Sequence, residues 1–138
     1  MRIMSLDVGT KRIGVAMSDE LLLTAQGADT IQRSSLEADI GRIKDLAAAN
    51  GVAEIVVGLP ISMNGSYSAK TNEVIEFSDK LAKAVDLPVK KWDERLTTVQ
   101  AERALLEADM SRAKRKRAID KVAAQIILQS YLDSRKKG

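Results

Sequence analysis

The sequence predicts an α/β fold in which a mixed sheet of five strands carries helices on both faces. Two observations lead to this prediction. Three extended segments follow one another in the first 31 residues, which is typical of strands joined as hairpins. Helical and extended segments then alternate along the rest of the chain, which indicates a sheet that gains parallel strands. With 138 residues and no internal repeat or linker between domains, the chain is expected to form one domain over residues 1–138.

The predicted strands are short apolar runs that end at glycine, proline or charged residues. The first two are joined by a tight connection at residues 9–12, and the third is more exposed. The fourth, "EIVVGLP", is apolar without alternation, as expected for a strand that is buried on both faces. The five strands are expected at residues 2–8, 13–19, 21–31, 54–60 and 87–94.

The helices are predicted from capping residues and from apolar positions at helical spacing. The first begins at Ser34, with Glu37 three residues further on as a capping box, and ends at "NG". The third begins at Thr97, with Gln100 in the same relation. A basic linker, "SRAKRKR", separates the third helix from the last. The four helices are expected at about residues 34–50, 68–85, 97–109 and 117–133.

The composition excludes several classes of enzyme. The chain has no cysteine, so it has neither a disulfide framework nor a thiolate zinc site. It has no histidine either, which excludes Ser-His-Asp triads, Cys-His dyads and histidine-ligated metals. Catalysis would therefore depend on carboxylates, lysine, tyrosine, serine or threonine, or on a metal held by oxygen ligands. The net charge of +3 suits a polyanionic partner without requiring one.

Acidic residues fall where a sheet of this type binds its ligands, which is beyond the carboxyl ends of the parallel strands. Asp7 closes the first strand, Asp93 and Glu94 close the last, and Asp120 lies at the start of the final helix. Adjacent strand residues face opposite ways, so only one of Asp93 and Glu94 can point into a shared cleft. Three separated acids at one edge are the oxygen ligands that one or two magnesium-type ions need.

Each acid also has a purely structural interpretation. Asp7 is followed two residues later by Gly9, which is ordinary turn chemistry. Asp93 and Glu94 could form ion pairs with neighbouring cations at a solvated strand end. Asp120 could be an acid in the first helical turn that the helix dipole favours. The metal-site hypothesis therefore depends on whether the acids converge.

Four motifs in order, "LDVGTKRIGVAMSD", "VVGLPISMNGS", "DERLTT" and "IDKVAAQIILQSYL", resemble those of the YqgF family, the Holliday-junction-resolvase-like nucleases of bacteria. The resemblance spans essentially the whole chain and implies a ribonuclease-H-like fold. It also implies that Asp7, Glu94 and Asp120 are catalytic residues and ligands of Mg²⁺ or Mn²⁺. A second acid three residues after Asp120, as in the related RuvC resolvases, is absent, because position 123 is alanine.

The function that this resemblance implies is nuclease processing of the 5′ end of the small-subunit (16S) ribosomal RNA precursor. The alternatives are a Holliday-junction resolvase and a non-catalytic RNA-binding or assembly factor. A nucleotide-binding domain of the sugar-kinase type is a less suitable interpretation of the sequence. Proteins of that class bind nucleotide between two such domains, and this chain has room for one. The expected partner is structured RNA or branched DNA, bound by a monomer or a weak homodimer.

Basic and polar residues near the predicted acids are candidate nucleic-acid contacts, although solvated surface groups would give the same pattern. They comprise a hairpin tip, a loop residue, a residue beside Glu94 and the basic run before Asp120. These are Thr10, Lys11, Arg12, Asn64, Arg95, Arg112, Lys114, Arg115, Lys116 and Arg117. The apolar runs are too short for a signal peptide or a membrane span, so a cytoplasmic protein without a membrane partner is expected.

Overall fold

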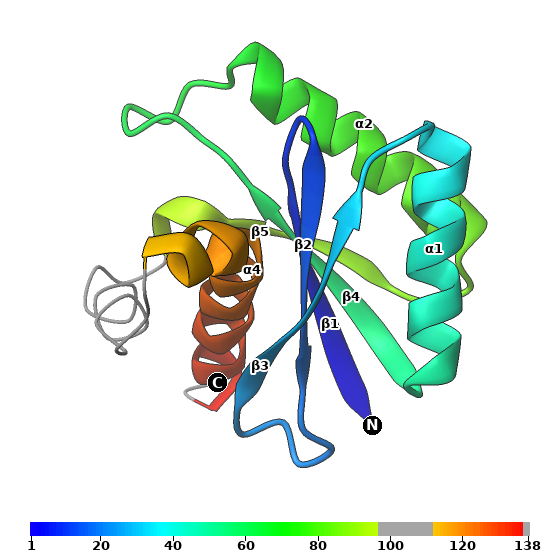
Figure 1. Cartoon of the computed structure of the whole chain (residues 1–138). Helices are drawn as coiled ribbons and strands as arrows, with labels where there is room; N and C mark the ends of the chain where they lie inside the picture. The colour runs from blue at the N-terminus through cyan, green and yellow to red at the C-terminus, as the bar shows by residue number, and fades with distance from the viewer. Residues whose placement is uncertain (97–111, 137–138) are drawn as a thin grey trace.

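In the computed structural model, which describes residues 1–96 and 112–136, five strands form one mixed sheet in the order β3-β2-β1-β4-β5 (Figure 1). The strands β1, β2 and β3 pair antiparallel, whereas β4 lies parallel to β1 and β5 parallel to β4. The predicted α/β class and mixed sheet are therefore confirmed. The elements are β1 (Arg2–Val8), β2 (Arg12–Ser18), β3 (Ala25–Gln32), α1 (Leu36–Ala49), β4 (Val52–Leu59), α2 (Ala69–Ala84), β5 (Val89–Asp93), the 3₁₀ helix η1 (Glu94–Leu96) and α4 (Arg112–Lys136).

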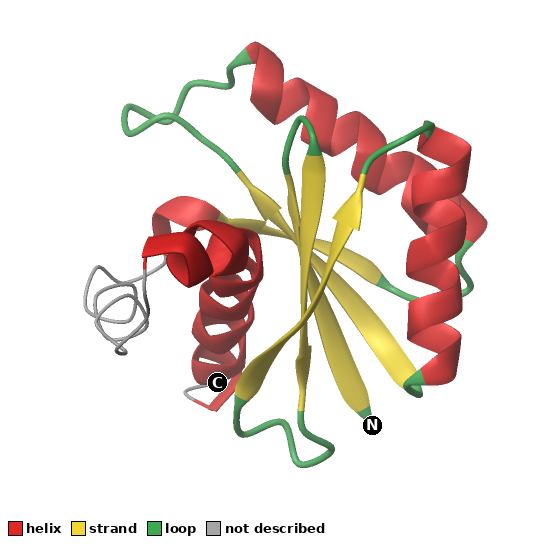
Figure 2. Cartoon of the chain, viewed as in Figure 1, coloured by secondary structure: helices red, strands yellow, loops and turns green. Residues whose placement is uncertain are grey.

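Helices cover both faces of the sheet, with α1 and α2 on one side and α4 on the other (Figure 2). The strand β1 contributes alternate residues to the two cores, because successive side chains of a strand point to opposite faces. Met4 and Leu6 pack with α1 and α2, whereas Ile3 packs with α4 and the Ser5 hydroxyl donates to the Ala124 carbonyl at 2.6 Å. The same alternation turns Asp7 toward the side of α4.

The third strand begins later than predicted, at Ala25 rather than residue 21. A turn occupies the difference, because the Asp19 carboxylate accepts hydrogen bonds from the backbone N–H groups of Leu23 (2.7 Å) and Thr24 (3.0 Å). Leu22 takes a positive φ of 60° inside that turn, which an extended strand does not allow. The hydrogen bonds to Asp19 therefore override the β propensity of this segment.

The first helix also begins one residue later than predicted. Ser35, not Ser34, is its N-cap, and the Ser35 hydroxyl accepts from the Ala38 N–H at 3.1 Å. The backbone N–H of Ser34 instead donates to the Asp39 carboxylate at 3.0 Å. The predicted N-cap is therefore wrong by one position, and the predicted capping box is wrong, because the residue three after Ser35 is Ala38, which has no side-chain acceptor.

The basic segment that was expected to be a linker is helical from Arg112 onward. Alanine, lysine and arginine favour helices, and neither glycine nor proline interrupts the run, so α4 extends through it without a break. The predicted helix at residues 97–109 lies outside the described residues. In the part of the chain that is described, no helix combines the length and apolar character needed to cross a bilayer.

A buried ion pair ties the first helix to the loop that follows β1. Asp39 is 1% exposed, and its carboxylate accepts from Arg33 Nε at 3.2 Å. The same guanidinium donates through Nη1 to the Gly9 carbonyl at 2.9 Å. Arg33 thus joins α1, the end of β3 and the β1–β2 connection, all beside the carboxyl end of β1.

We expect Asp39→Ala to lower the free energy of unfolding by about 2–4 kcal/mol, because it leaves the Arg33 guanidinium and the Ser34 N–H without their partner. Urea unfolding of the variant and the parent measures the difference. Asp45→Ala is the matched control, since Asp45 is an exposed acid on the same helix. An equal loss in the two variants would show that the buried pair contributes nothing beyond a surface acid.

Candidate active site

The first acid, Asp7, is followed by a connection that only glycine can make. The Gly9 N–H donates to the Arg12 carbonyl at 2.9 Å, and a Cβ on Gly9 would lie 2.7 Å from that oxygen. The chain therefore reverses immediately after β1. This turn places Thr10, Lys11 and Arg12 at an exposed tip next to Asp7, as the sequence analysis expected.

At the end of β5 the structure separates the roles of Asp93 and Glu94. Trp92 faces α4, where its ring meets Tyr131 edge-on with centroids 5.4 Å apart. Asp93 pairs with Arg95, whose Nη2 donates to Oδ2 at 2.7 Å, and these hydrogen bonds hold the pKa of Asp93 below its ordinary value. Of the two adjacent acids, Glu94 is the one that turns toward Asp7.

Asp7 and Glu94, the acid pair, share a hydrogen bond between their side chains. Burial, the charge of Asp7, that hydrogen bond and the charge of Asp93 together raise the pKa of Glu94 from 4.5 to about 7. A hydrogen bond between two carboxyl groups requires a proton on one of them. The acid pair therefore retains a proton at a pH where isolated carboxyl groups have lost theirs.

Gly58 makes room for this arrangement at the end of β4. Its position lies beside Asp7 in the sheet, because Leu6 of β1 pairs with Val57 of β4. A Cβ on Gly58 would lie 2.7 Å from Glu94 Oε1 and would collide with Ile127 Cδ1 of α4. The Glu94 carboxylate thus occupies the space that a side chain at position 58 would fill.

The third predicted acid, Asp120, lies in α4, and its backbone can be placed relative to β1. The Ser5 hydroxyl binds the carbonyl of Ala124, and Tyr131 further along α4 binds Glu54, which is level with Ile3. The helix therefore runs opposite to β1, and Asp120, one turn before Ala124, lies toward the Asp7 end. Its side chain lies outside the described ones, among which no group of three potential metal-binding residues occurs.

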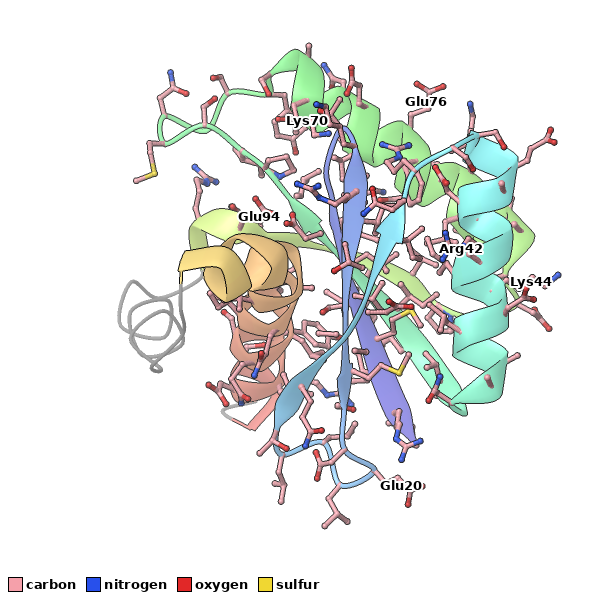
Figure 3. All side chains as sticks on the ribbon, viewed as in Figure 1. Glu20, Arg42, Lys44, Lys70, Glu76 and Glu94 are labelled. Atoms are coloured by element: carbon pink, nitrogen blue, oxygen red, sulfur yellow. The ribbon has the colours of Figure 1, made fainter. Side chains whose placement is uncertain are left out.

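Lys70 is a charged residue at the site that the sequence analysis missed. It lies in the first turn of α2, after the N-cap Ser68, and its positive charge lowers the pKa of Glu94 against the other influences. Figure 3 shows Lys70 and Glu94 toward the same end of the sheet, with Glu20 at the opposite end. Nothing in the sequence distinguishes this lysine, since its approach to Glu94 depends on the loop that joins β4 to α2.

The other predicted contacts lie in the loop after β4, next to Glu94 and at the start of α4. Asn64 uses its side-chain oxygen to accept from the Ser66 N–H at 3.0 Å, which shapes the loop after β4. Arg95 lies against that loop, because a Cβ on Gly65 would be 3.6 Å from its Nη1. The basic run, Arg112, Lys114, Arg115, Lys116 and Arg117, forms the first turns of α4, and its side chains are outside the described ones.

The raised pKa of Glu94 predicts a pH-dependent effect of Glu94→Gln on stability in the presence of a chelator. Between pH 4.5 and 7 the folded protein keeps a proton that the unfolded chain has lost, so this carboxyl destabilises the fold increasingly as pH rises. Above pH 7 the penalty reaches about 1–3 kcal/mol, allowing for solvent screening of a partly exposed group.

Denaturant unfolding of the parent and of Glu94→Gln should therefore coincide near pH 5 and diverge at pH 8, where the variant is the more stable. The neutral amide can still donate a hydrogen bond to Asp7, so the change removes charge with little change in shape. The same difference at both pH values would contradict the raised pKa.

The sheet order, the crossing of α4 and the acid pair at the carboxyl edge of β1 define a nuclease of the ribonuclease-H-like class. Residues 1–134 match the family described as RuvX, Holliday junction resolvase, and the chain belongs to this family. Similar proteins carry the name "Putative pre-16S rRNA nuclease". One from Moorella thermoacetica is 57% identical over 133 residues (96% of this chain and 95% of the relative), and one from Halothermothrix orenii is 55% identical over 137 residues (99% and 98%).

Solved structures agree on the fold. The RuvC protein of Thermus thermophilus, in complex with a Holliday junction substrate, superposes with a TM-score of 0.68 at 13% identity and covers 99% of this chain and 96% of its own. The fowlpox virus Holliday junction resolvase gives 0.60 at 16% identity, covering 97% and 99%. At these identities the likeness concerns the fold alone.

Proposed function

We propose that this chain is a divalent-metal-dependent endonuclease whose substrate is the 5′ end of the 16S ribosomal RNA precursor, and that residues 1–138 form one nuclease domain. The observation that carries the proposal is the acid pair, two carboxyl groups from distant parts of the chain that interact at the sheet edge, with Glu94 partly buried. The names of relatives that are 52–57% identical support the choice of substrate.

The residues present fit a hard divalent cation such as Mg²⁺ or Mn²⁺. The described donors are carboxylate oxygens, which these ions prefer, and crowding them together leaves an excess of negative charge that a cation would balance in place of the proton. Asp7, Glu94 and Asp120 would hold the metal. When bound, such an ion polarises a phosphate oxygen and makes a bound water a stronger nucleophile.

The remaining residues of the site bind and position the nucleic acid. Thr10, Lys11 and Arg12 form the exposed tip that follows Asp7, where hydroxyl and cationic groups suit phosphate oxygens. Arg95 lies next to Glu94 against the loop that carries Asn64. The basic run of α4 leads toward Asp120 and would follow the strand through its phosphates, independently of base sequence.

Incubation with three substrates tests the proposal: a 16S precursor fragment with its 5′ extension, an unrelated structured RNA, and a four-way DNA junction. Each is tested with magnesium, with manganese and with a chelator. Metal-dependent cleavage of the precursor near its mature 5′ end supports the proposal. Cleavage of the junction alone would instead indicate a resolvase, and tight binding without cleavage of any substrate would indicate a non-catalytic assembly factor.

A further inference from the structure

We propose that Lys70 binds a non-bridging phosphate oxygen of the substrate strand at the acid pair and so positions that strand for cleavage. This inference rests on the proposed nuclease function and assigns a role to a residue that the comparisons and the sequence motifs leave without one. It depends on the burial of Lys70, on its pairing, and on the charges around it.

Burial distinguishes Lys70 from the other lysines whose side chains are described. Those lysines are exposed, whereas Lys70 is partly buried between α2 and the carboxyl edge of the sheet. Burial of an ammonium group is unfavourable unless a compensating partner is present. The nearby charge of Glu94 supplies part of that compensation, because Lys70 and Glu94 interact electrostatically.

Lys70 also differs from neighbouring lysines in having no ion-pair partner among the described residues. Lys80, on the same helix, forms an ion pair with Glu76 at 3.0 Å, and Lys91 forms one with Asp79 at 3.1 Å. Within the described residues, no acid lies within ion-pair distance of the Lys70 ammonium. Its three donor hydrogens are therefore available to a ligand that arrives at the acid pair.

The residues around Lys70 indicate on which side of this lysine the phosphate binds. Lys70 borders a pocket of about 270 Å³ between the end of β1 and α2, which is also lined by Phe77, Glu73 and Glu76. The other cations on these walls, Arg33 and Lys80, already form ion pairs with Asp39 and Glu76, so the pocket itself adds little attraction for a phosphate. The charge of Lys70 also acts on Glu94, and both residues lie toward the same end of the sheet (Figure 3). A metal-bound phosphodiester at the acid pair would bring negative charge there, so we place the phosphate on that side.

Lysine acts on phosphate as a point charge, and both RNA and DNA present the same phosphodiester. Lys70 should therefore contribute to binding of either nucleic acid without selecting its base sequence. Discrimination between RNA and DNA would have to come from other contacts.

The test compares Lys70→Gln with Lys70→Arg and with Lys83→Gln, which removes an exposed charge from the last turn of the same helix. Binding to RNA and to duplex DNA is measured at a fixed magnesium concentration, in an Asp7→Asn background that blocks cleavage, over a range of salt concentrations. Loss of one phosphate contact should reduce the slope of log affinity against log salt by about 0.7–0.9 and weaken binding roughly 5- to 10-fold at low salt.

Lys70→Gln should show this reduced slope, Lys70→Arg should restore it, and Lys83→Gln should match the parent. In the cleavage-competent protein, Lys70→Gln should raise KM more than it lowers kcat. A slope for Lys70→Gln equal to that of Lys83→Gln would overturn the inference even if the parent cleaves RNA. A parent that binds but cleaves nothing would overturn the proposed function, and the salt slopes would still decide the role of Lys70.

Discussion

Asp7→Asn is expected to lower metal-dependent cleavage by about 10³-fold or more while the protein stays folded, because it removes a charged metal ligand without changing the size of the side chain. Asparagine removes the negative charge that raises the pKa of Glu94, so the metal-free variant should be at least as stable as the parent at pH 8. Single-turnover cleavage with saturating enzyme, and thermal melts in chelator, measure the two effects separately.

The control for this prediction is Asp86→Asn, which neutralises an exposed acid between α2 and β5, at the opposite end of β5 from Glu94. It should retain parental cleavage. Asp120→Asn tests the third proposed ligand by the same measurements, and magnesium should stabilise the parent more than either Asp7→Asn or Asp120→Asn. Cleavage by Asp7→Asn within tenfold of the parent would contradict a metal-ligand role for Asp7.

The elements that frame this site could be predicted from the sequence because their signals are local. The apolar run before Asp7, the glycine after it and the apolar strand ending near Gly58 identify β1, the turn and β4 by themselves. The choice between Asp93 and Glu94 could not be made in the same way. It depends on which face of β5 packs against α4, and that is fixed by the contact of Trp92 with Tyr131, a residue from the far end of the chain.

Lys70 and Asp39 show a second limit of sequence reasoning. A lysine in the first turn of a helix gives no sign of a nearby acid when that acid lies 24 positions further along the chain. Asp39, in turn, resembles any acid near a helix N-terminus, although its carboxylate is buried and bound to Arg33. Both positions acquire their roles from contacts between elements, which a pattern of residue types does not encode.

Gly58→Ala is expected to reduce cleavage by roughly 10²-fold, because displacing a catalytic group by about 1 Å has an effect of that size. The new methyl group would lie 2.7 Å from Glu94 Oε1, so the carboxylate must move away from Asp7. It also collides with Ile127, which is 3% exposed in the core under α4, and overpacking there should lower stability by about 1–3 kcal/mol. Cleavage rates and urea unfolding of the purified variant measure both effects.

A second substitution separates the two consequences. Ile127→Val removes the methyl group that meets the new Cβ, so Gly58→Ala with Ile127→Val should regain part of the lost stability. It should not regain cleavage, since the contact with Glu94 remains.

Gly41→Ala is the matched control, because a Cβ there meets nothing within 4 Å, and the change in α1 should raise stability by about 0.5–1 kcal/mol without affecting cleavage. Full cleavage by Gly58→Ala would show that the position of Glu94 tolerates this displacement, and full recovery of cleavage in the double variant would assign the defect to core packing.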